Sequence, residues 1–399
     1  MLGRWRTMTL CDIPEQSDTS TGIQSLDLPE GVPPLRSLYL YLTASCNLRC
    51  RHCWIAPEFS SRPVPLKAIN PKALQDAVIE AKTIGLAHVK LTGGEPMLHP
   101  QFKEIVDMLT GEGLSMNLET NGTMITREIA HYLREKTNVK FVSISIDSSV
   151  PDEHDAFRGV RGAFDAALSG LDNLVEAGYT TCQVIMSVHR GNRDHMEDLA
   201  RLATDHKAAS VKFNPVGSIG RGSAMRERGE TLDFREHIDL FNWVNKELRP
   251  KVPIQVLMFL PQALTPLNEF WRMNGRLFDC GISTTLGILG TGEIALCGVG
   301  QVIRELVYGR LGENSIRDIW FTHPTILKLR RDLKDVYRYP GICGSCIHAK
   351  SCRTSCVANN YVYSGKLVFP QWLCNEADRE GVFPKTRLRD IGSEHRKSG

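Results

Sequence analysis

Short apolar runs alternate with amphipathic stretches between residues 37 and 250. Each run is a few residues long and rich in Val, Ile, Leu or aromatic side chains, which is typical of a buried strand. The pattern predicts six strands, at residues 38–43, 88–92, 115–120, 140–147, 181–188 and 210–215.

The stretches between these runs carry apolar residues at three- and four-residue spacing, the period of an amphipathic helix. Pro71 and Pro100 lie where helices start, and Gly85, Gly113 and Gly178 lie where they end. The predicted helices are residues 71–85, 100–113, 126–136, 163–178 and 193–206.

Repeated strand–helix units predict an α/β fold in which parallel strands are joined by right-handed crossovers, as an open doubly wound sheet or as a barrel. Both architectures place chemistry at the C-terminal ends of the strands. Several polar or cysteine residues follow predicted strands directly, namely Cys46, Gly93 to Pro96, Asn121 and Asp147. We therefore expect them to share one rim and one site.

The chain is too long for one core, since single cores stop growing near 250 to 300 residues. The strand–helix rhythm fails after about residue 250, and glycine and cysteine dominate from Cys280 to Cys374. The predicted division is a lead-in at 1–36, an α/β unit at 37–250, a bridging region at 251–279, a cysteine-rich domain at 280–378 and a tail at 379–399.

Charge and hydropathy exclude several classes of partner. The chain has 48 Lys and Arg against 45 Asp and Glu, so no strong overall field favours nucleic acid or a membrane surface. No segment has the apolar run of a signal peptide or of a membrane span. We expect a cytoplasmic protein that acts on a small or peptidic substrate.

Twelve cysteines are many for a reducing compartment, in which structural disulfides are rare, so metal binding is the natural explanation. Three lie near residue 50 and seven lie between residues 280 and 374. Cys11 and Cys182 stand apart. Cys182 falls in an apolar strand and is expected to be an ordinary buried cysteine.

The first group, Cys46-x3-Cys50-x2-Cys53, follows the first predicted strand. Three thiolates at this spacing can hold three corners of an iron–sulfur cubane and leave one iron open. Zinc is the competing interpretation, but structural zinc needs a fourth ligand and usually occurs with paired CxxC elements.

This motif resembles the defining CxxxCxxC of the radical S-adenosylmethionine (SAM) superfamily, and the resemblance covers about residues 37–250. It implies a partial (β/α)6 barrel of the TIM type and a [4Fe-4S] cluster that binds SAM. Residues Gly93, Gly94, Glu95 and Pro96 resemble the GGEP element that binds the methionyl amino group of SAM. Glycine permits close backbone approach, and Glu95 can accept a hydrogen bond from an ammonium.

Further segments resemble elements of the same superfamily. Residues 119–123 resemble its third-strand element, and residues 213–222 resemble a GRG loop that lies near SAM and substrate. Ser145 and Arg158 stand where relatives have a ribose-contacting serine and an arginine that reaches the SAM carboxylate, although the spacing is one residue longer. His52 stands where an aromatic residue packs near adenine. A capping serine, a surface arginine and a loop histidine are the ordinary alternatives.

The second group of cysteines matches the SPASM domain pattern of radical SAM maturases at every spacing. The resemblance implies two auxiliary [4Fe-4S] clusters, an outer one on Cys343, Cys346, Cys352 and Cys374, and an inner one on Cys280, Cys297 and Cys356. Relatives with full ligation have another cysteine shortly before the first, and this chain has none there. The inner cluster thus has either an open iron for a peptide group or a non-cysteine ligand, for which Asp279 is the nearest candidate.

The domain pairing implies a peptide maturase. The SAM-derived 5′-deoxyadenosyl radical would abstract hydrogen from a ribosomally made precursor peptide and give a crosslink, thioether, epimer or spliced product. Haem or other cofactor biosynthesis and sulfatase maturation are alternatives, and an iron–sulfur electron-transfer or scaffold protein is an alternative of another class. No carboxylate, Lys or Tyr stands out as the general acid or base.

Two partners follow from this interpretation. A leader-binding module of about 80 residues does not fit in the 36-residue lead-in, so a separate peptide-recognition protein is expected. An external one-electron donor such as flavodoxin or ferredoxin is expected to reduce the protein.

Overall fold

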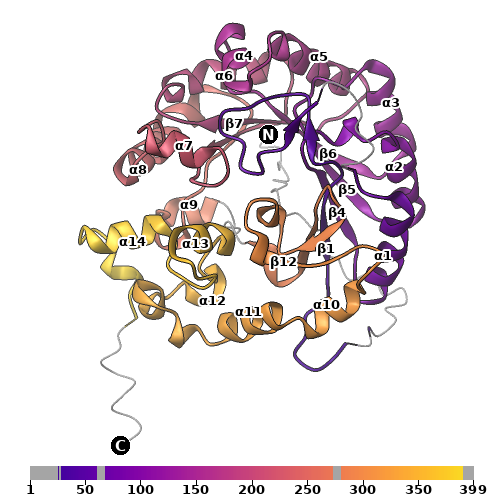
Figure 1. Cartoon of the computed structure of the whole chain (residues 1–399). Helices are drawn as coiled ribbons and strands as arrows, with labels where there is room; N and C mark the ends of the chain where they lie inside the picture. The colour runs from indigo at the N-terminus through magenta and orange to yellow at the C-terminus, as the bar shows by residue number, and fades with distance from the viewer. Residues whose placement is uncertain (1–25, 27, 61–67, 273–279, 390–399) are drawn as a thin grey trace, which may run out of the picture.

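The computed structural model describes residues 26, 28–60, 68–272 and 280–389. One large curved sheet of ten strands runs through the described residues, in the order β12-β11-β10-β1-β4-β5-β6-β7-β8-β9 (Figure 1). Because β12 and β9 end this order without pairing to each other, the sheet is an open, partial barrel.

The six predicted strands are confirmed. They are β1 (Ser37–Tyr41), β4 (His88–Thr92), β5 (Ser115–Thr120), β6 (Val139–Ser145), β7 (Gln183–Val188) and β8 (Ser210–Pro215). Neighbouring strands among them are parallel, as the strand–helix rhythm predicts.

The five predicted helices are also present. They are α1 (Pro71–Thr83), α2 (Phe102–Gly111), α3 (Arg127–Lys136), α5 (Ala163–Glu176) and α6 (Met196–Asp205). They lie on the convex side of the sheet (Figure 1). A further helix, α4 (Pro151–Arg158), forms in the segment that we compared only with a fourth-strand element.

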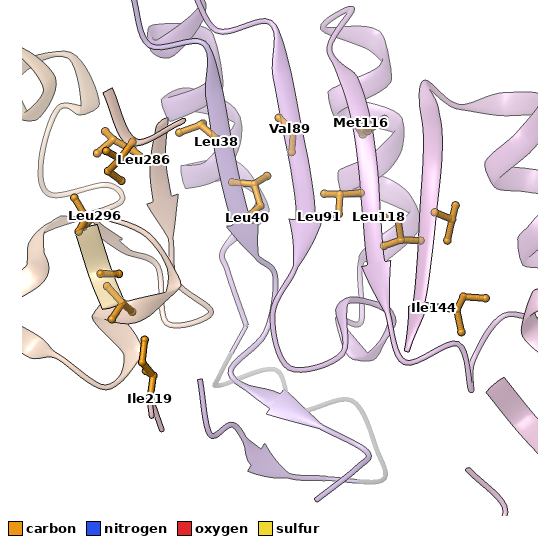
Figure 2. Close-up of a cluster of buried hydrophobic side chains, with 14 of the residues drawn as sticks. Leu38, Leu40, Val89, Leu91, Met116, Leu118, Ile144, Ile219, Leu286 and Leu296 are labelled. Carbon is orange, nitrogen blue, oxygen red and sulfur yellow. The ribbon is translucent and has the colours of Figure 1, made fainter. Parts of the chain in front are cut away.

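Alternation along the strands separates the two faces of the sheet. One set of apolar side chains is almost fully buried against the helices, as Figure 2 shows for Leu38, Leu40, Val89, Leu91 and Leu118. The alternate positions face the concave side and are often polar. The concave side is therefore the place where a site can form.

The sheet continues into the cysteine-rich region. Strand β10 (Thr285–Ile288) pairs in parallel with β1, and β11 (Glu293–Ala295) and β12 (Val307–Arg310) add antiparallel strands beyond it. At the other edge β9 (Gln255–Leu257) pairs with β8. The residues after Cys280 are thus joined to the first strand by backbone hydrogen bonds.

Helices complete the C-terminal part. They are α10 (Ile316–Thr322), α11 (Pro324–Lys334), α12 (Ala349–Cys352), α13 (Val357–Ser364) and α14 (Trp372–Arg379), and α7 (Gly222–Glu227), α8 (Phe234–Trp243) and α9 (Leu267–Arg272) precede them. Across the described ranges, every helix is too short or too polar to cross a bilayer.

Candidate active site

The cysteine triplet lies in the loop that follows β1, where the short strand β2 (Ser45–Cys46) pairs with β3 (Glu58–Phe59). Cys46 and Cys50 are buried and Cys53 is partly buried. Burial raises the pKa of the Cys46 thiol, and Glu95 and the other two thiols raise it further. The structure therefore brings the three predicted ligands together in a poorly solvated loop.

The GGEP loop after β4 packs directly against the cysteine loop. The backbone N–H of Gly94 donates to the Thr43 carbonyl at 3.0 Å, and the N–H of Glu95 donates to the Ser45 carbonyl at 2.9 Å. A Cβ atom on Gly94 would overlap the Ser45 carbonyl oxygen. The glycine that we expected to allow approach to SAM is thus already needed for approach to the cysteine loop.

Glu95 is fully buried at this junction. Its carboxylate accepts hydrogen bonds from the Thr120 hydroxyl at 2.8 Å, from the Asn121 N–H at 2.9 Å and from the Met97 N–H at 3.3 Å. Burial raises the pKa of this carboxyl to about 7, against the three hydrogen bonds that lower it. A carboxylate has about four acceptor positions, so a SAM ammonium would share Glu95 with these contacts.

The third-strand element joins the same network. Asn121 donates from its side-chain amide to the Asn47 side-chain oxygen at 2.7 Å, and it lies 3.9 Å from the Cys46 sulfur. Asn47 in turn donates to the Thr123 hydroxyl at 2.8 Å. The predicted rim of strands β1, β4 and β5 is therefore one hydrogen-bonded unit.

Arg158 is buried, so the alternative of a surface arginine is wrong. Its Nε donates to the Asp147 carboxylate at 2.5 Å, and its Nη1 lies 3.6 Å from the Cys50 sulfur. Burial disfavours the charged form of Asp147, but Arg158, with smaller contributions from His52, His154 and the Ser187 N–H, lowers the pKa of that carboxyl. The guanidinium is thus fixed beside the cysteine triplet.

Two predicted residues lie on or near the concave face. Ser145 ends β6 on this face and is only partly buried. His52 stacks on Phe157 with ring centroids 4.5 Å apart, and Phe157 stacks on His189 at 4.6 Å. Burial lowers the pKa of His52 to about 3, and its Nδ1 atom is buried without a hydrogen-bond partner. Such an orphaned atom is a candidate contact for a bound molecule.

The loop that contains Gly220 to Gly222 reaches the cysteine triplet. Arg221 donates from its side chain to the carbonyls of Cys50 at 3.1 Å and Pro57 at 2.7 Å, and its N–H donates to the Cys53 carbonyl at 3.0 Å. This loop thereby ties the C-terminal end of β8 to the proposed cluster loop.

Three other cysteines form the inner set. A hydrogen bond joins the thiols of Cys280 and Cys356. Burial raises the pKa of the Cys297 thiol to about 12, and the charge of Cys356 contributes to this increase. Tyr41 accepts a hydrogen bond from the Gly298 N–H at 2.9 Å, beside this set. Asp279, the candidate fourth ligand, lies outside the described residues.

The outer set lines a small pocket with Cys343, Cys346, Cys352 and Cys374. Burial raises the pKa of Cys343 to about 12, and its neighbours Cys352 and Cys346 contribute. Around the set, His348 Nε2, Arg387 Nε and Arg389 Nη1 are buried donors without partners. Unsatisfied buried donors beside soft thiol ligands fit a missing anionic group such as an iron–sulfur cluster.

The ten cysteines that we predicted as ligands fall into these three sets, and within each set the thiols are close enough to affect one another's pKa. Within the described ranges, no three Cys, His, Asp or Glu side chains converge as ligands of a single ion. Cys182 is buried in the core, as expected. Cys11 lies outside the described residues.

A cavity of about 840 Å³ lies between the end of β8 and the helices α13 and α14. Aromatic side chains line it at Phe213, Phe259, Tyr363 and Trp372, and Cys356 of the inner set is part of its wall. Sequence patterns gave no signal of this cavity because its walls come from segments that are separate in sequence, mainly 212–237, 259–261 and 355–380.

The concave face also holds an ion pair that the sequence did not single out. Lys90 of β4 lies 2.6 Å from the Glu119 carboxylate of β5. The Lys90 ammonium also lies 4.9 Å from the centre of the Tyr39 ring. The sequence signal for this pair is the alternation of side chains along β4 and β5. It places Lys90 and Glu119 on the face of the sheet opposite the residues that pack against the helices.

Together, a parallel partial barrel and a CxxxCxxC loop at its C-terminal rim define a class of protein. Residues 40–203 match the radical SAM superfamily, so the chain carries a radical SAM domain. This confirms the predicted family and fold class.

Particular relatives span most of the chain. It is 28% identical to the AdoMet-dependent heme synthase of Oleidesulfovibrio alaskensis, over 88% of this chain and 90% of that protein. It is 27% identical to the mycofactocin maturase MftC of Mycobacterium tuberculosis, over 87% of this chain and 84% of that protein.

A solved structure shares the fold. Streptococcus suis SuiB bound to S-adenosylmethionine aligns with a TM-score of 0.66 at 16% identity, over 85% of this chain and 76% of that one. SuiB bound to its precursor peptide SuiA aligns with a TM-score of 0.64 at 15% identity, over 85% and 75% of the chains.

Proposed function

We propose that this radical SAM enzyme is a peptide maturase that abstracts hydrogen from a ribosomally made precursor peptide. The observation that carries the proposal is the cavity of about 840 Å³ with Cys356 in its wall. Its volume is within the range of ligand-binding clefts, and its mixture of aromatic and amide side chains suits a peptide. The similarity to a mycofactocin maturase supports the same substrate class.

The residues of the rim have separate tasks in this proposal. A [4Fe-4S] cluster on Cys46, Cys50 and Cys53, together with SAM, supplies a 5′-deoxyadenosyl radical when both are bound. The N–H groups of Gly94 and Glu95 hold the GGEP loop against the cysteine loop, and Gly93 permits close approach to the backbone of Tyr41 and Thr43. Glu95 and Pro96 then border the amino group of SAM.

Other residues orient the remainder of SAM. Arg158 provides fixed positive charge beside Cys50, and it suits the carboxylate of SAM. The orphaned His52 Nδ1 atom lies in an aromatic stack that suits adenine. Ser145, on the concave face, is proposed to contact ribose.

The two distal sets of cysteines are proposed to hold auxiliary [4Fe-4S] clusters within a SPASM domain at residues 280–378, while residues 37–250 form the radical SAM barrel. The unpartnered donors around the outer set support a cluster there. The inner set has three thiols, so its fourth position is either filled by a non-cysteine ligand or open to the peptide.

We further propose the partners and the compartment. A separate recognition protein presents the leader of the peptide, and a one-electron carrier reduces the enzyme. All described cysteines are free thiols, which suits the reducing cytoplasm.

The test uses anaerobically reconstituted, dithionite-reduced protein with SAM and the small peptide encoded beside its gene. We expect a mass change in the peptide, or an epimer without one, in the wild type and in Cys182→Ala. Cys182 is a matched control because it is buried outside the three sets. Cys356→Ala should still form 5′-deoxyadenosine but should not complete the modification.

Haem synthesis is the second candidate, because a heme synthase is as similar to this chain as the maturase is. Conversion of an added porphyrin substrate, with the peptide unchanged in chemistry and configuration, would replace the maturase proposal with this one.

A further inference from the structure

Two segments that border the outer cysteine set lack acidic residues. Residues 336–375 and 381–389 contain no Asp or Glu. The same segments carry seven basic residues, Arg338, Lys350, Arg353, Lys366, Lys385, Arg387 and Arg389. The whole chain is nearly balanced in charge, so this excess of basic residues produces a local positive field.

The two acid-free segments meet at the loop that carries Cys343 and Cys346. An antiparallel bridge pairs Cys346 with Leu388. The Ile347 N–H donates to the Arg387 carbonyl at 2.9 Å, and the Arg389 N–H donates to the Ser345 carbonyl at 2.7 Å. Basic side chains from both segments therefore gather around the outer set.

Exposed apolar side chains lie among these cations. Tyr337 is 71% exposed and Ile347 is 48% exposed. The Arg389 guanidinium lies 4.6 Å from the centre of the Tyr337 ring. An apolar centre with a charged rim is the usual anatomy of a transient protein interface.

The other exposed face near a cysteine set differs in charge. Beside the triplet, Arg51 is paired with Glu230 at 2.8 Å, and Glu58 is exposed. The positive charge there is compensated. On the surface of the outer set, Arg338 is paired with Asp335 at 3.1 Å, but the two segments themselves contain no carboxylate beside Lys350 and Lys385. An acidic protein would consequently be attracted to the outer set.

We propose that the basic surface around Tyr337, Ile347, Lys350 and Lys385 is the docking site of an acidic one-electron carrier protein. The proposal rests on the proposed function in one respect, that the outer cysteines hold a [4Fe-4S] cluster. The carrier is oxidised by one electron and the outer cluster is reduced by one electron, and no covalent bond changes.

The buried donors connect this surface to the cluster site. Arg387, Arg389 and His348 carry the unpartnered N–H groups around the outer thiols. Hydrogen bonds and positive charge at cluster sulfurs favour the reduced state. The same residues therefore stabilise an electron that arrives from the docked carrier.

The experiment measures how fast reduced [2Fe–2S] ferredoxin, an acidic carrier, is oxidised by the reconstituted full-length enzyme in a stopped-flow instrument. The variant combines Arg338→Glu, Lys350→Glu and Lys385→Glu, all at exposed positions. We expect its second-order rate constant to fall by about tenfold or more at low ionic strength. Added salt should slow the wild type and have little effect on the variant.

The control combines Lys136→Glu, Lys140→Glu and Lys246→Glu, which change the net charge equally at exposed positions outside this surface. An unchanged rate in the test variant, or an equal loss in the control, would overturn the docking site. Dithionite-driven 5′-deoxyadenosine formation is measured on the same samples. If neither the wild type nor the two variants form 5′-deoxyadenosine, the proposed function is refuted. If they form it and the test variant oxidises ferredoxin at the wild-type rate, only the docking site is refuted.

Discussion

At the scale of single residues, the buried charges near the cysteine triplet are held by specific partners. Asp147 is 1% exposed and receives hydrogen bonds from Arg158 and from the Ser187 N–H. Arg158 also lies against Cys50. A buried pair of this kind contributes little net stability, but loss of one partner leaves an uncompensated charge.

Asp147→Asn should lower the free energy of unfolding by about 3 to 5 kcal/mol, because the Arg158 guanidinium would remain buried without its counter-ion. Urea unfolding measures this change. Asp76→Asn is the control, since the exposed pair of Asp76 with Lys72 should contribute less than about 1 kcal/mol. Equal effects of the two substitutions would contradict the assignment.

His88 gives a prediction about pH. Burial, with a smaller effect of Lys90, lowers its pKa from 6.5 to about 4. Below pH 6.5 the unfolded chain takes up a proton that the folded protein does not bind. The free energy of unfolding should therefore fall by about 1.4 kcal/mol per pH unit from this residue as pH decreases from 6.5 toward 4.

Urea unfolding of the wild type and His88→Gln between pH 7.5 and 5.5 tests this dependence. The variant should lose the corresponding part of the slope. His131→Gln, at an exposed position on α3, should keep the wild-type slope. A parallel pH profile for His88→Gln would show that His88 does not cause the effect.

At the scale of elements, three loops from separate strand ends are locked around one site. The GGEP loop binds the cysteine loop through backbone hydrogen bonds, and the loop after β8 binds it through Arg221. Close backbone packing of this kind leaves no room for an added side chain.

Gly94→Ala should disrupt this packing, because its Cβ would overlap the Ser45 carbonyl oxygen. We expect at least a tenfold loss of SAM affinity, measured by equilibrium binding to the reconstituted protein, together with lower iron content. Gly111→Ala is the matched control, since its Cβ would meet no atom within 4 Å. Wild-type SAM affinity in Gly94→Ala would show that the two loops do not depend on each other.

Regular periodicity determined which elements could be predicted. The strands β1 and β4 to β8 and their helices have long apolar patterns, and the structure contains all of them. Strands β9 to β12 have three or four residues each, too few for a period to show. Helix α4 gives a weak apolar period because it has eight residues, of which only His154, Phe157 and Arg158 are buried.

The residues of the candidate site also differ in whether the sequence could indicate them. Spacing identified the first three cysteines, but the inner and outer sets were separated by the resemblance to the SPASM pattern, because Cys356 of the inner set lies between Cys352 and Cys374 of the outer set. The stack of His52, Phe157 and His189 and the pair of Lys90 with Glu119 join residues from different strands or loops. Such contacts depend on tertiary packing, which a single sequence does not display.

At the scale of the whole molecule, one sheet carries both the triplet and the start of the cysteine-rich region. Because β10 pairs with β1, the inner set is attached to the same strand that leads into the triplet. The cavity lies between β8 and α13, with Cys356 of the inner set in its wall, and the outer set lines a separate small pocket. Under the proposed function, a peptide in this cavity would lie against Cys356 of the inner set.

The most direct test of the central claim is the formation of 5′-deoxyadenosine from SAM by the anaerobically reconstituted and reduced protein. The wild type and Cys182→Ala should form it, and Cys46→Ala should form none above background. Wild-type protein that contains iron and sulfide at the triplet yet forms no 5′-deoxyadenosine would contradict the account.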